Sequence, residues 1–574
     1  MTISSVLADP AAPRRRWAAL LLVLATLALY LPGLASLPPM DRDEPRFAQA
    51  SKQMLETGDF VDIRYQDEAR NKKPVGIYWL QAGAVSLGQA LGVADARRTI
   101  WLYRLPSLFG AILAVLGAYW VGLAVTTRRA AFLGALLFAA TVILTVESHL
   151  AKTDAVLCAT VVWAMGALLR IYLGSRDRGA PAVAPWLPAV FWTAIGLGIL
   201  VKGPITPMVP AFTVVALVLR DRSGRWLCAL RPGLGLAWVL LLVLPWLGLI
   251  LVRTHGAFLA DSVGHDMLGK VGGAQESHGA PPGTYLLAFW ATAWPMAPFA
   301  ALAAPGAWRR RGEPAVFFLL AWIVPTWLLF EIVTTKLPHY VMPTYPAVAI
   351  LAALVLEAPG ALRAPGKPGR VGAVVLAILF GLLPLGLAVV LAFGHGFLWD
   401  ALSPGALVLG LLATVAAAAL AGTAWVQVRR GAFAPAAMAA VGAAFVVNLF
   451  VLGFLLTPAA SPLLAVSRHT ALAGREATPA ECAGMTYASV GDHEPSLVFL
   501  TGTSLQLTDA AGAARFLQGG DCRGAFVEAR TEAAFRAALG DLAGVHLASR
   551  VAGTAINGGK HLDIGIYVRQ RSQP

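Results

Sequence analysis

The strongest constraint on the fold of this chain is a series of long apolar runs that recurs along about its first 455 residues. Each run has about 17–25 residues, the length that a helix needs to cross a hydrocarbon core of about 30 Å. Only 13% of the residues are charged, whereas soluble domains contain roughly 25%. No A-x-A-like cleavage site follows the first run, so we interpret that run as a retained span. The sequence therefore predicts a mainly α-helical, polytopic membrane protein.

The apolar runs predict about thirteen transmembrane helices. They lie at residues 17–35, 105–125, 130–148, 153–173, 186–201, 204–219, 233–252, 284–304, 314–334, 339–356, 371–393, 401–426 and 431–456. A further run at residues 75–91 is shorter and contains three glycines and Gln89. If this run does not cross, Arg and Lys clusters fall on every second loop, and the positive-inside rule places all of them in the cytoplasm. We therefore predict that residues 75–91 form an interfacial helix along the outer face.

The positive clusters account for a formal net charge of +14. They include Arg14–Arg16, Arg128–Arg129, Arg220 with Arg222, Arg309–Arg311 and Arg429–Arg430. Basic residues beside spans orient a membrane protein, and no RNP, helix-turn-helix or zinc-finger pattern indicates nucleic acid binding. The predicted topology has the N-terminus in the cytoplasm and the C-terminus outside.

The sequence predicts two domains. Residues 1–456 form the transmembrane domain, with long outer loops at 36–104 and 253–283, and residues 457–574 form a small soluble α/β domain outside the membrane. In the second domain, residues 496–500, 525–528 and 562–568 are typical of strands and residues 532–539 of a helix. Cys482 and Cys522 lie in this domain. In an oxidising compartment they predict one disulfide, with two free thiols as the alternative.

The first outer loop opens with a charged segment that contains Asp43, Glu44 and Arg46. Such a segment is often only a solvated face. The residues that follow, 47–55, predict an amphipathic helix lying on the membrane interface, and its positive dipole end favours an ionised carboxylate at headgroup depth. Lys72 and Lys73 precede the interfacial run, and they either extend toward anionic headgroups or pair with a phosphate on a membrane-embedded substrate.

Two outer turns place ionisable residues beside apolar helices. Asp154 follows a charged turn with Glu147 and Lys152 and begins an apolar helix. A carboxylate at that depth costs several kcal/mol unless it is paired or hydrated, so it is a candidate functional residue, with a helix N-cap as the alternative. Lys202 lies in a Lys-Gly-Pro break between two runs. That position favours either anion capture or extension of the lysine toward the interface.

The last two outer segments add further candidates. The glycine-rich loop at 253–283 could close as a lid, and it contains Lys270, a candidate for gripping a phosphate. It also contains metal-ligand residue types, although their spacing fits no standard site: His265, Asp266, Glu276 and His278. Lys336, His339 and Tyr345 begin a later span, and they indicate either substrate contacts or a headgroup-level aromatic belt.

Taken in order, these motifs resemble a known family. They are Asp43-Glu44-Pro45-Arg46, Lys73-Pro74 with Gly76 and Tyr78-Trp79, Asp154, Lys202-Gly203-Pro204 and Lys336-x-Pro-His-Tyr-x-x-Pro-x-Tyr-Pro. The set resembles bacterial membrane glycosyltransferases of the GT-C fold in the protein mannosyltransferase-like group, and within that group the lipid A aminoarabinose transferases. The resemblance covers about the first 350 residues. Relatives often carry Arg where this chain has Lys270, which keeps the charge but loses the bidentate fork.

The resemblance implies an inverting glycosyltransferase, specifically a pentosyltransferase. It implies transfer of 4-amino-4-deoxy-L-arabinose from undecaprenyl phosphate to lipid A phosphate groups at the periplasmic face of the bacterial inner membrane, giving resistance to polymyxin. The catalytic group would comprise Asp43 and Asp154, together with Glu44 and Arg46. The donor phosphate and lipid would be bound by Lys72, Lys73, Lys202, Lys270, Lys336, His339 and Tyr345.

The same resemblance sets the expected partners. They are the lipid-linked donor, the lipid A acceptor and membrane lipids, without nucleic acid, and the chain is expected to act as a monomer. No cofactor is expected to be required, with a divalent ion in the 253–283 loop as the alternative. Another polyprenyl-phosphate-sugar transferase, such as a protein O-mannosyltransferase, remains open. From another class, a lipid transporter or flippase predicts ionisable residues near the midplane and internal symmetry, whereas here the charges gather on the outer face.

Overall fold

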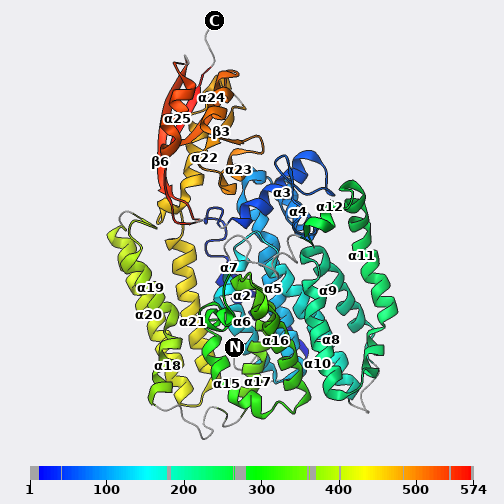
Figure 1. The fold of residues 1–574 in the computed structure, drawn as a ribbon. Helices are drawn as coiled ribbons and strands as arrows, with labels where there is room; N and C mark the ends of the chain where they lie inside the picture. Colours follow the sequence, from blue (N-terminus) through cyan, green and yellow to red (C-terminus); the bar gives the residue numbers. More distant parts are fainter. Residues whose placement is uncertain are drawn as a thin grey trace.

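The chain folds into a helical bundle with a smaller α/β unit at one end (Figure 1). The computed structural model describes residues 12–40, 42–176, 183–262, 264, 279–358, 361, 370–399, 402–482, 484–541, 544–556 and 558–570. The bundle is built from α2 (Ala12–Tyr30), α5 (Ile100–Val125), α6 (Arg128–Ala139), α7 (Val142–Ser148), α8 (Asp154–Arg176), α9 (Trp186–Lys202), α10 (Ile205–Asp221), α11 (Pro232–Arg253), α14 (Thr284–Thr292), α15 (Ala297–Arg309), α16 (Pro314–Ile332), α17 (Tyr345–Leu356), α18 (Arg370–Phe380), α19 (Leu382–Phe393), α20 (Pro404–Arg429) and α21 (Phe433–Phe450).

Many of these helices suit a bilayer, where every backbone polar group must be satisfied within its own segment. Among the described residues, seven helices are long and apolar enough to cross alone, and two bent pairs bring the number to nine if each pair crosses once. Two shorter apolar helices are Trp17–Tyr30, which is most of α2, and Trp186–Lys202, which is α9. The protein is therefore an integral membrane protein, while the number of about thirteen spans stays a prediction.

Three runs that the sequence predicts as continuous spans are broken. α6 and α7 meet at 63°, and the helices α18 and α19 meet at 61°. At the second break, Pro384 lies in the first turn of α19, and proline cannot donate the backbone hydrogen bond that would continue the preceding helix. The run at 284–304 is divided between α14 and α15.

The loops that the sequence predicts to face outward, called the outer loops below, form short elements at the end of the bundle that faces the α/β unit (Figure 1). These are α3 (Asp43–Thr57), β1 (Arg64–Tyr65), β2 (Glu68–Ala69), α4 (Gly76–Ala90), η1 (Ala96–Arg98), α12 (Ala257–Leu259) and η4 (Pro338–Thr344). α4 occupies the run that we predicted to be interfacial, and it packs closely on α9. A Cβ on Gly76 would lie 2.7 Å from the carbonyl oxygen of Leu200, so this close approach requires glycine.

The helix predicted at residues 47–55 forms, and other parts of the protein cover most of it, while its placement on the membrane interface stays a prediction. This helix is α3, which lies between α4 and the α/β unit, and most of its residues are buried. Its polar side chains are used inside the protein. Gln49 donates to Thr503 Oγ1 at 2.7 Å, and Lys52 donates to the carbonyl of Phe499 at 3.2 Å. The polar face that suggested solvent exposure instead receives the second domain.

The α/β unit contains one five-stranded sheet in the order β4-β3-β5-β7-β6. Its elements are α22 (Val466–Glu476), β3 (Thr486–Val490), α23 (Pro495–Thr501), β4 (Gln506–Thr508), α24 (Ala510–Gln518), β5 (Arg523–Glu528), α25 (Ala529–Leu539), β6 (Val545–Thr554) and β7 (His561–Arg569). β3 runs parallel to β4 and β5, whereas β7 runs antiparallel to β5 and β6. Cys482 and Cys522 form a disulfide beside this sheet.

The secondary structure of this unit matches most of the sequence prediction. Strands at 525–528 and 562–568 lie within β5 and β7, and the helix at 532–539 lies within α25. The predicted strand at 496–500 is wrong, because these residues form α23. Pro495 occupies the first position of this helix, where its fixed φ favours helix initiation.

The helices cover the two faces of the sheet separately. On one face, α22 and α23 pack against β5 and β7 through a cluster that includes Leu497 and Phe526. On the other face, α24 and α25 pack through a cluster that includes Leu517 and Phe535. The unit docks on the bundle through Phe499, which packs edge-on against Tyr103 of α5 with ring centroids 5.3 Å apart.

Candidate active site

A cavity of about 990 Å³ lies where the outer loops of the bundle meet the α/β unit. Ionisable side chains from the bundle and its loops line it: Arg42, Asp43, Arg70, Lys72, Lys73, Glu147, Lys152, Asp154, Lys202, His339 and Tyr340. Six of the residues predicted from the sequence are among them: Asp43, Lys72, Lys73, Asp154, Lys202 and His339. Segments far apart in the sequence thus place their charges around one space.

Asp154 anchors the membrane side of this cavity. It is the first residue of α8, it is buried, and its Oδ1 forms an ion pair with the ammonium of Lys202. The Nε2 of His339 lies 3.5 Å from the same oxygen. Lys202 ends α9 because Gly203 follows with φ +65, a conformation that glycine adopts without steric cost. The break directs the lysine toward the carboxylate that begins the neighbouring helix.

Glu147 and Lys152 belong to the same cluster, although their sequence positions predicted only a charged turn before Asp154. The Lys152 ammonium lies 3.5 Å from Glu147 Oε1, and His339 Nδ1 lies 3.3 Å from that oxygen. The second carboxylate oxygen of Glu147 is buried and has no hydrogen-bond partner among the described residues. The charge density of this turn was the signal that could have assigned both residues to the site.

The cluster has the residue types of a metal site. One potential ligand atom each from Glu147, Asp154 and His339 lie within 4.8 Å of one another. Carboxylate and imidazole groups are common metal ligands. Here, however, the ammonium groups of Lys152 and Lys202 already neutralise the two carboxylates. A mixed array of ammonium groups and carboxylates suits a phosphorylated ligand as well as it suits a cation.

Asp43 reaches the cavity from the start of α3. Its side chain is 49% exposed, and its Oδ1 lies 3.9 Å from Nη1 of Arg46. Arg46 is not among the residues that line the cavity. Lys72 and Lys73 enter from the segment before α4, next to Asn71, which donates to Asp261 at 3.0 Å. A partly exposed carboxylate and two lysines thus approach the Asp154 cluster from the first outer loop.

Glu44 does not belong to the cavity, which corrects its assignment as a catalytic residue. Its carboxylate and the guanidinium of Arg104 are both fully buried and pair at 2.7 and 3.0 Å. The same carboxylate accepts the backbone amides of Met40 at 2.6 Å and Ala151 at 3.0 Å. Glu44 therefore ties three segments of the fold together, and its charge is satisfied.

Lys336 and Tyr345, which the sequence predicts to bind the donor, do not line this cavity, and their role in donor binding stays a prediction. The Lys336 ammonium donates to three carbonyl oxygens at the end of α16, which is how a lysine stabilises a helix C-terminus. The Tyr345 hydroxyl is buried and hydrogen-bonds to Thr292 at 2.7 Å. The site residues predicted in the 253–283 loop lie outside the described residues: His265, Asp266, Lys270, Glu276 and His278.

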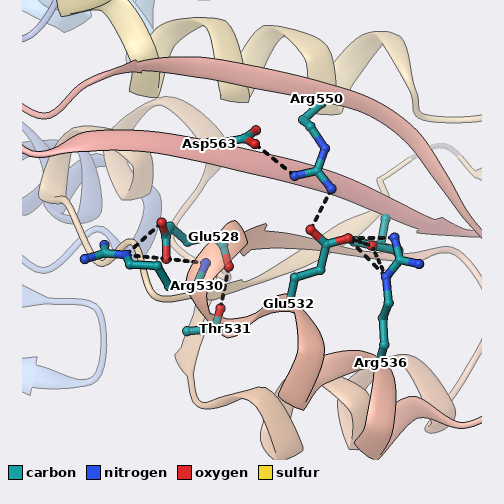
Figure 2. A network of polar contacts seen from close by, with 8 residues as sticks. Glu528, Arg530, Thr531, Glu532, Arg536, Arg550 and Asp563 are labelled. Atoms are coloured by element: carbon teal, nitrogen blue, oxygen red, sulfur yellow. Dashed lines mark hydrogen bonds and ion pairs between the residues drawn. The ribbon is translucent and has the colours of Figure 1, made fainter.

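The α/β unit forms the other wall of the cavity. It contributes Gly491–Glu494 after β3, Arg530 in α25, and residues of the β6–β7 hairpin that include Lys560. Figure 2 shows how Arg530 is held: its Nε lies 2.9 Å from each oxygen of Glu528. Apart from the disulfide cysteines, none of the predicted site residues lies in this unit, because no motif there signals a site.

The chain is similar in sequence to proteins whose names describe sugar transfer from lipid carriers. Residues 72–248 match the family model described as dolichyl-phosphate-mannose-protein mannosyltransferase. The chain is 27% identical over 338 residues to the undecaprenyl phosphate-alpha-4-amino-4-deoxy-L-arabinose arabinosyl transferase of Erwinia tasmaniensis, covering 58% of each protein. It is also 27% identical over 343 residues to transferase 2 of that name from Pseudomonas fluorescens, covering 59% of each.

The structural likeness extends over nearly the whole chain. ArnT from Cupriavidus metallidurans, solved with bound undecaprenyl phosphate, superimposes with a TM-score of 0.76 at 19% identity, covering 97% of this chain and 98% of that one. The sequence matches span about three fifths of the length of the curated relatives. Residues 72–248 are thus similar to the mannosyltransferase family model, and the chain as a whole has the GT-C fold of ArnT.

Proposed function

We propose that this chain transfers 4-amino-4-deoxy-L-arabinose from undecaprenyl phosphate to phosphate groups of lipid A. The names of the relatives give the lipid carrier and the transferred sugar of this reaction, and a solved structure with the same fold holds undecaprenyl phosphate. The observation that carries the proposal is the pairing of Lys202 with Asp154 in a cavity that Lys73 and Asp43 also line. Such a site offers cations to a leaving phosphate and carboxylates to a sugar.

The proposed reaction is a single displacement with inversion at the anomeric carbon. An oxygen of the lipid A phosphate forms a bond to that carbon, and the bond from the carbon to the undecaprenyl phosphate oxygen breaks. The electron pair of the broken bond remains on the leaving phosphate, whose charge increases as it departs. Ammonium groups placed there beforehand stabilise this charge without reorganisation. Lys73, Lys152 and Lys202 are the lysines that we assign to this role.

The carboxylates have a complementary role. A lipid A phosphate is already ionised near neutral pH, so the reaction requires no strong general base. Asp43 is accessible from the cavity, and we assign it to orienting the acceptor and stabilising positive charge on the sugar. Asp154 is buried against Lys202 and His339, and we assign it to holding these two groups toward the phosphate.

We further propose that the cavity faces the periplasm from the bacterial inner membrane. Arg128, Arg309 and Arg429 lie at ends of α6, α15 and α20, and the positive-inside rule places such residues in the cytoplasm. These helix ends lie at the end of the bundle away from the α/β unit (Figure 1). We also propose that a single chain is the active unit.

A protein O-mannosyltransferase is the second candidate, because residues 72–248 match that family model. Mass spectrometry of lipid A from bacterial cells with and without the gene separates the two. The proposal predicts a mass increase of one aminopentose on lipid A that depends on the gene. Hexose on a protein with unchanged lipid A would favour the mannosyltransferase. The absence of both products would favour a transporter or flippase.

The proposed reaction requires no cofactor, because lysines neutralise the leaving phosphate. We therefore expect purified protein to retain its transferase activity after treatment with EDTA. Transfer measured with and without added Mg²⁺ or Mn²⁺ checks this. Loss of activity that a divalent ion restores would instead support a metal at Glu147, Asp154 and His339, or in the 253–283 loop.

A further inference from the structure

The α/β unit presents a crevice to the cavity at the carboxyl ends of two parallel strands. β3 and β5 pair in parallel, with Val490 opposite Val527, so the segments that follow both strands emerge at the same edge. The chain after β3 continues into α23 on one face of the sheet, whereas the chain after β5 continues into α25 on the other. Parallel α/β sheets bind ligands where the connections diverge in this way. Both segments line the cavity.

The turn after β3 is built tightly against the end of β5. Gly491 has φ +82, and a Cβ at this position would lie 2.8 Å from the Cβ of Glu528. The turn is fixed further by the Ser489 hydroxyl, which donates to the carbonyl of Asp492 at 2.5 Å. The next residues, Asp492 and Glu494, bring two carboxylates to the wall of the cavity.

Asp492 is incompletely satisfied in this position. The residue is 4% exposed, and its Oδ2 has no hydrogen-bond partner among the described residues. A buried polar atom without a partner costs free energy that a bound donor group would recover. Burial and the nearby Glu494 carboxylate raise the pKa of Asp492 to about 6, so the group is largely ionised near pH 7. A ligand that donates a hydrogen bond to Asp492 Oδ2 from the cavity would satisfy this oxygen.

The surrounding charges determine the sign of that ligand. The N-terminus of α25 is already capped by Glu528, which accepts the amide of Arg530 at 3.1 Å (Figure 2). Glu528 also holds the guanidinium of Arg530 on both of its oxygens. The helix end that could have bound a phosphate therefore carries its own carboxylate. His493 and Lys560 also line this wall, but the Arg530 guanidinium is paired with Glu528 and the turn itself adds the carboxylates of Asp492 and Glu494. The turn therefore favours a cation, whereas the membrane side of the cavity carries Lys73 and Lys202.

We propose that the turn with Asp492 and Glu494 is the subsite for the ammonium group of the transferred sugar. This inference rests on the proposed function, in which the sugar is an aminopentose. In a pentopyranose, the anomeric carbon and C4 lie at opposite sides of the ring. A donor with its phosphate at the lysines would extend C4 away from them, toward the wall that the α/β unit forms. The second domain would then select the cationic sugar.

Two donors test the subsite with purified full-length protein: undecaprenyl phosphate-linked 4-amino-4-deoxy-L-arabinose and the same molecule N-acetylated, which is neutral. For the amine donor, Asp492→Asn is expected to lower kcat/KM by roughly tenfold to a hundredfold, because the variant loses one charged hydrogen bond. For the acetylated donor, kcat/KM is expected to change by no more than about twofold. Glu481→Gln is the matched control, because Glu481 is an exposed carboxylate of the same unit that does not line the cavity.

The outcomes separate the subsite from the proposed function. An unchanged preference for the amine donor in Asp492→Asn, or an equal loss with both donors, would overturn the subsite while transfer by the wild type persists. No transfer by the wild type would contradict the proposed function, and direct titration of the two donors then tests the subsite by binding alone. If thermal unfolding shows that Asp492→Asn does not fold, Glu494→Gln, at a partly exposed position, carries the same expectation.

Discussion

Asp43 and Glu44 are adjacent in the sequence, yet the fold gives their carboxylates opposite environments. Asp43 is half-exposed beside the cavity. Glu44 is fully buried against Arg104, which lies 60 residues away. The sequence indicated a functional acidic segment, but it contained no signal for which carboxylate a distant arginine would capture. That decision belongs to the tertiary structure.

The two carboxylates therefore predict two different mutant phenotypes. Asp43→Asn should lower transfer by about 10²–10⁴-fold without changing thermal unfolding, because the residue acts on the substrate and supports no packing. Glu44→Gln should lower the free energy of unfolding by about 3 kcal/mol, because it leaves the buried Arg104 charge without its partner. Transfer assays and thermal unfolding in detergent check both variants. Wild-type stability in Glu44→Gln would contradict its anchoring role.

A similar division separates the lysines. Lys202 follows a helix break and reaches Asp154, as its motif suggested. Lys336 lies in a motif of the same kind, but its ammonium caps the end of α16. Both residues were predicted to bind the donor. Only the direction in which each preceding helix ends separates a cavity lysine from a capping lysine, and that direction depends on packing.

At the scale of elements, α3 shows that a correctly predicted helix can have a packing partner that its own sequence does not predict. Its amphipathic pattern predicted a helix, and the helix forms. Amphipathicity alone cannot distinguish a polar face turned to solvent from one covered by another domain. Lys52 decides between them here, because its side chain is 2% exposed and its ammonium donates to the carbonyl of Phe499 in α23.

The burial of Lys52 predicts a pH dependence of stability. Burial lowers the pKa of Lys52 from 10.5 to about 8, although Glu56 opposes the shift. Between these two values the unfolded chain binds more protons than the folded one, so the free energy of unfolding rises with pH across that window. The rise attributable to Lys52 is on the order of 3 kcal/mol.

Lys52→Met is the matched variant for this measurement, because it keeps the length of the side chain without a titrating group. Unfolding in detergent, followed at several pH values above 8, should show a smaller rise in stability for Lys52→Met than for the wild type. Equal pH slopes for the two proteins would show that Lys52 does not titrate in this interface.

At the scale of the whole molecule, the two ends of the bundle have different roles. The α/β unit and the outer loops enclose the cavity at one end, and α10 and α11 join at the other through η2 (Arg225–Leu230) (Figure 1). Cys228 lies in η2 and is exposed, whereas Cys158 is buried and the other two cysteines form the disulfide. The Cys228 thiol therefore allows the accessibility of the end that we place in the cytoplasm to be measured by labelling.

This arrangement predicts the pattern of thiol labelling. A membrane-impermeant maleimide should leave the wild-type protein unlabelled in intact spheroplasts and should label Cys228 after permeabilisation. Ser504→Cys, at an exposed position of the α/β unit, should be labelled in both conditions. Labelling of Cys228 in intact spheroplasts would reverse the proposed orientation and place the cavity in the cytoplasm.

The sequence by itself determined that this is a membrane protein, because apolar length is a local property. The positions of the charges along the chain predicted which loops carry the candidate site residues. The sequence also located Asp43, Lys73, Asp154 and Lys202, which line one cavity. Only the tertiary structure removed Glu44, Lys336 and Tyr345 from that cavity and added the wall formed by Asp492 and Arg530. The physical reason is that burial and pairing depend on partners tens to hundreds of residues away, which no local pattern encodes.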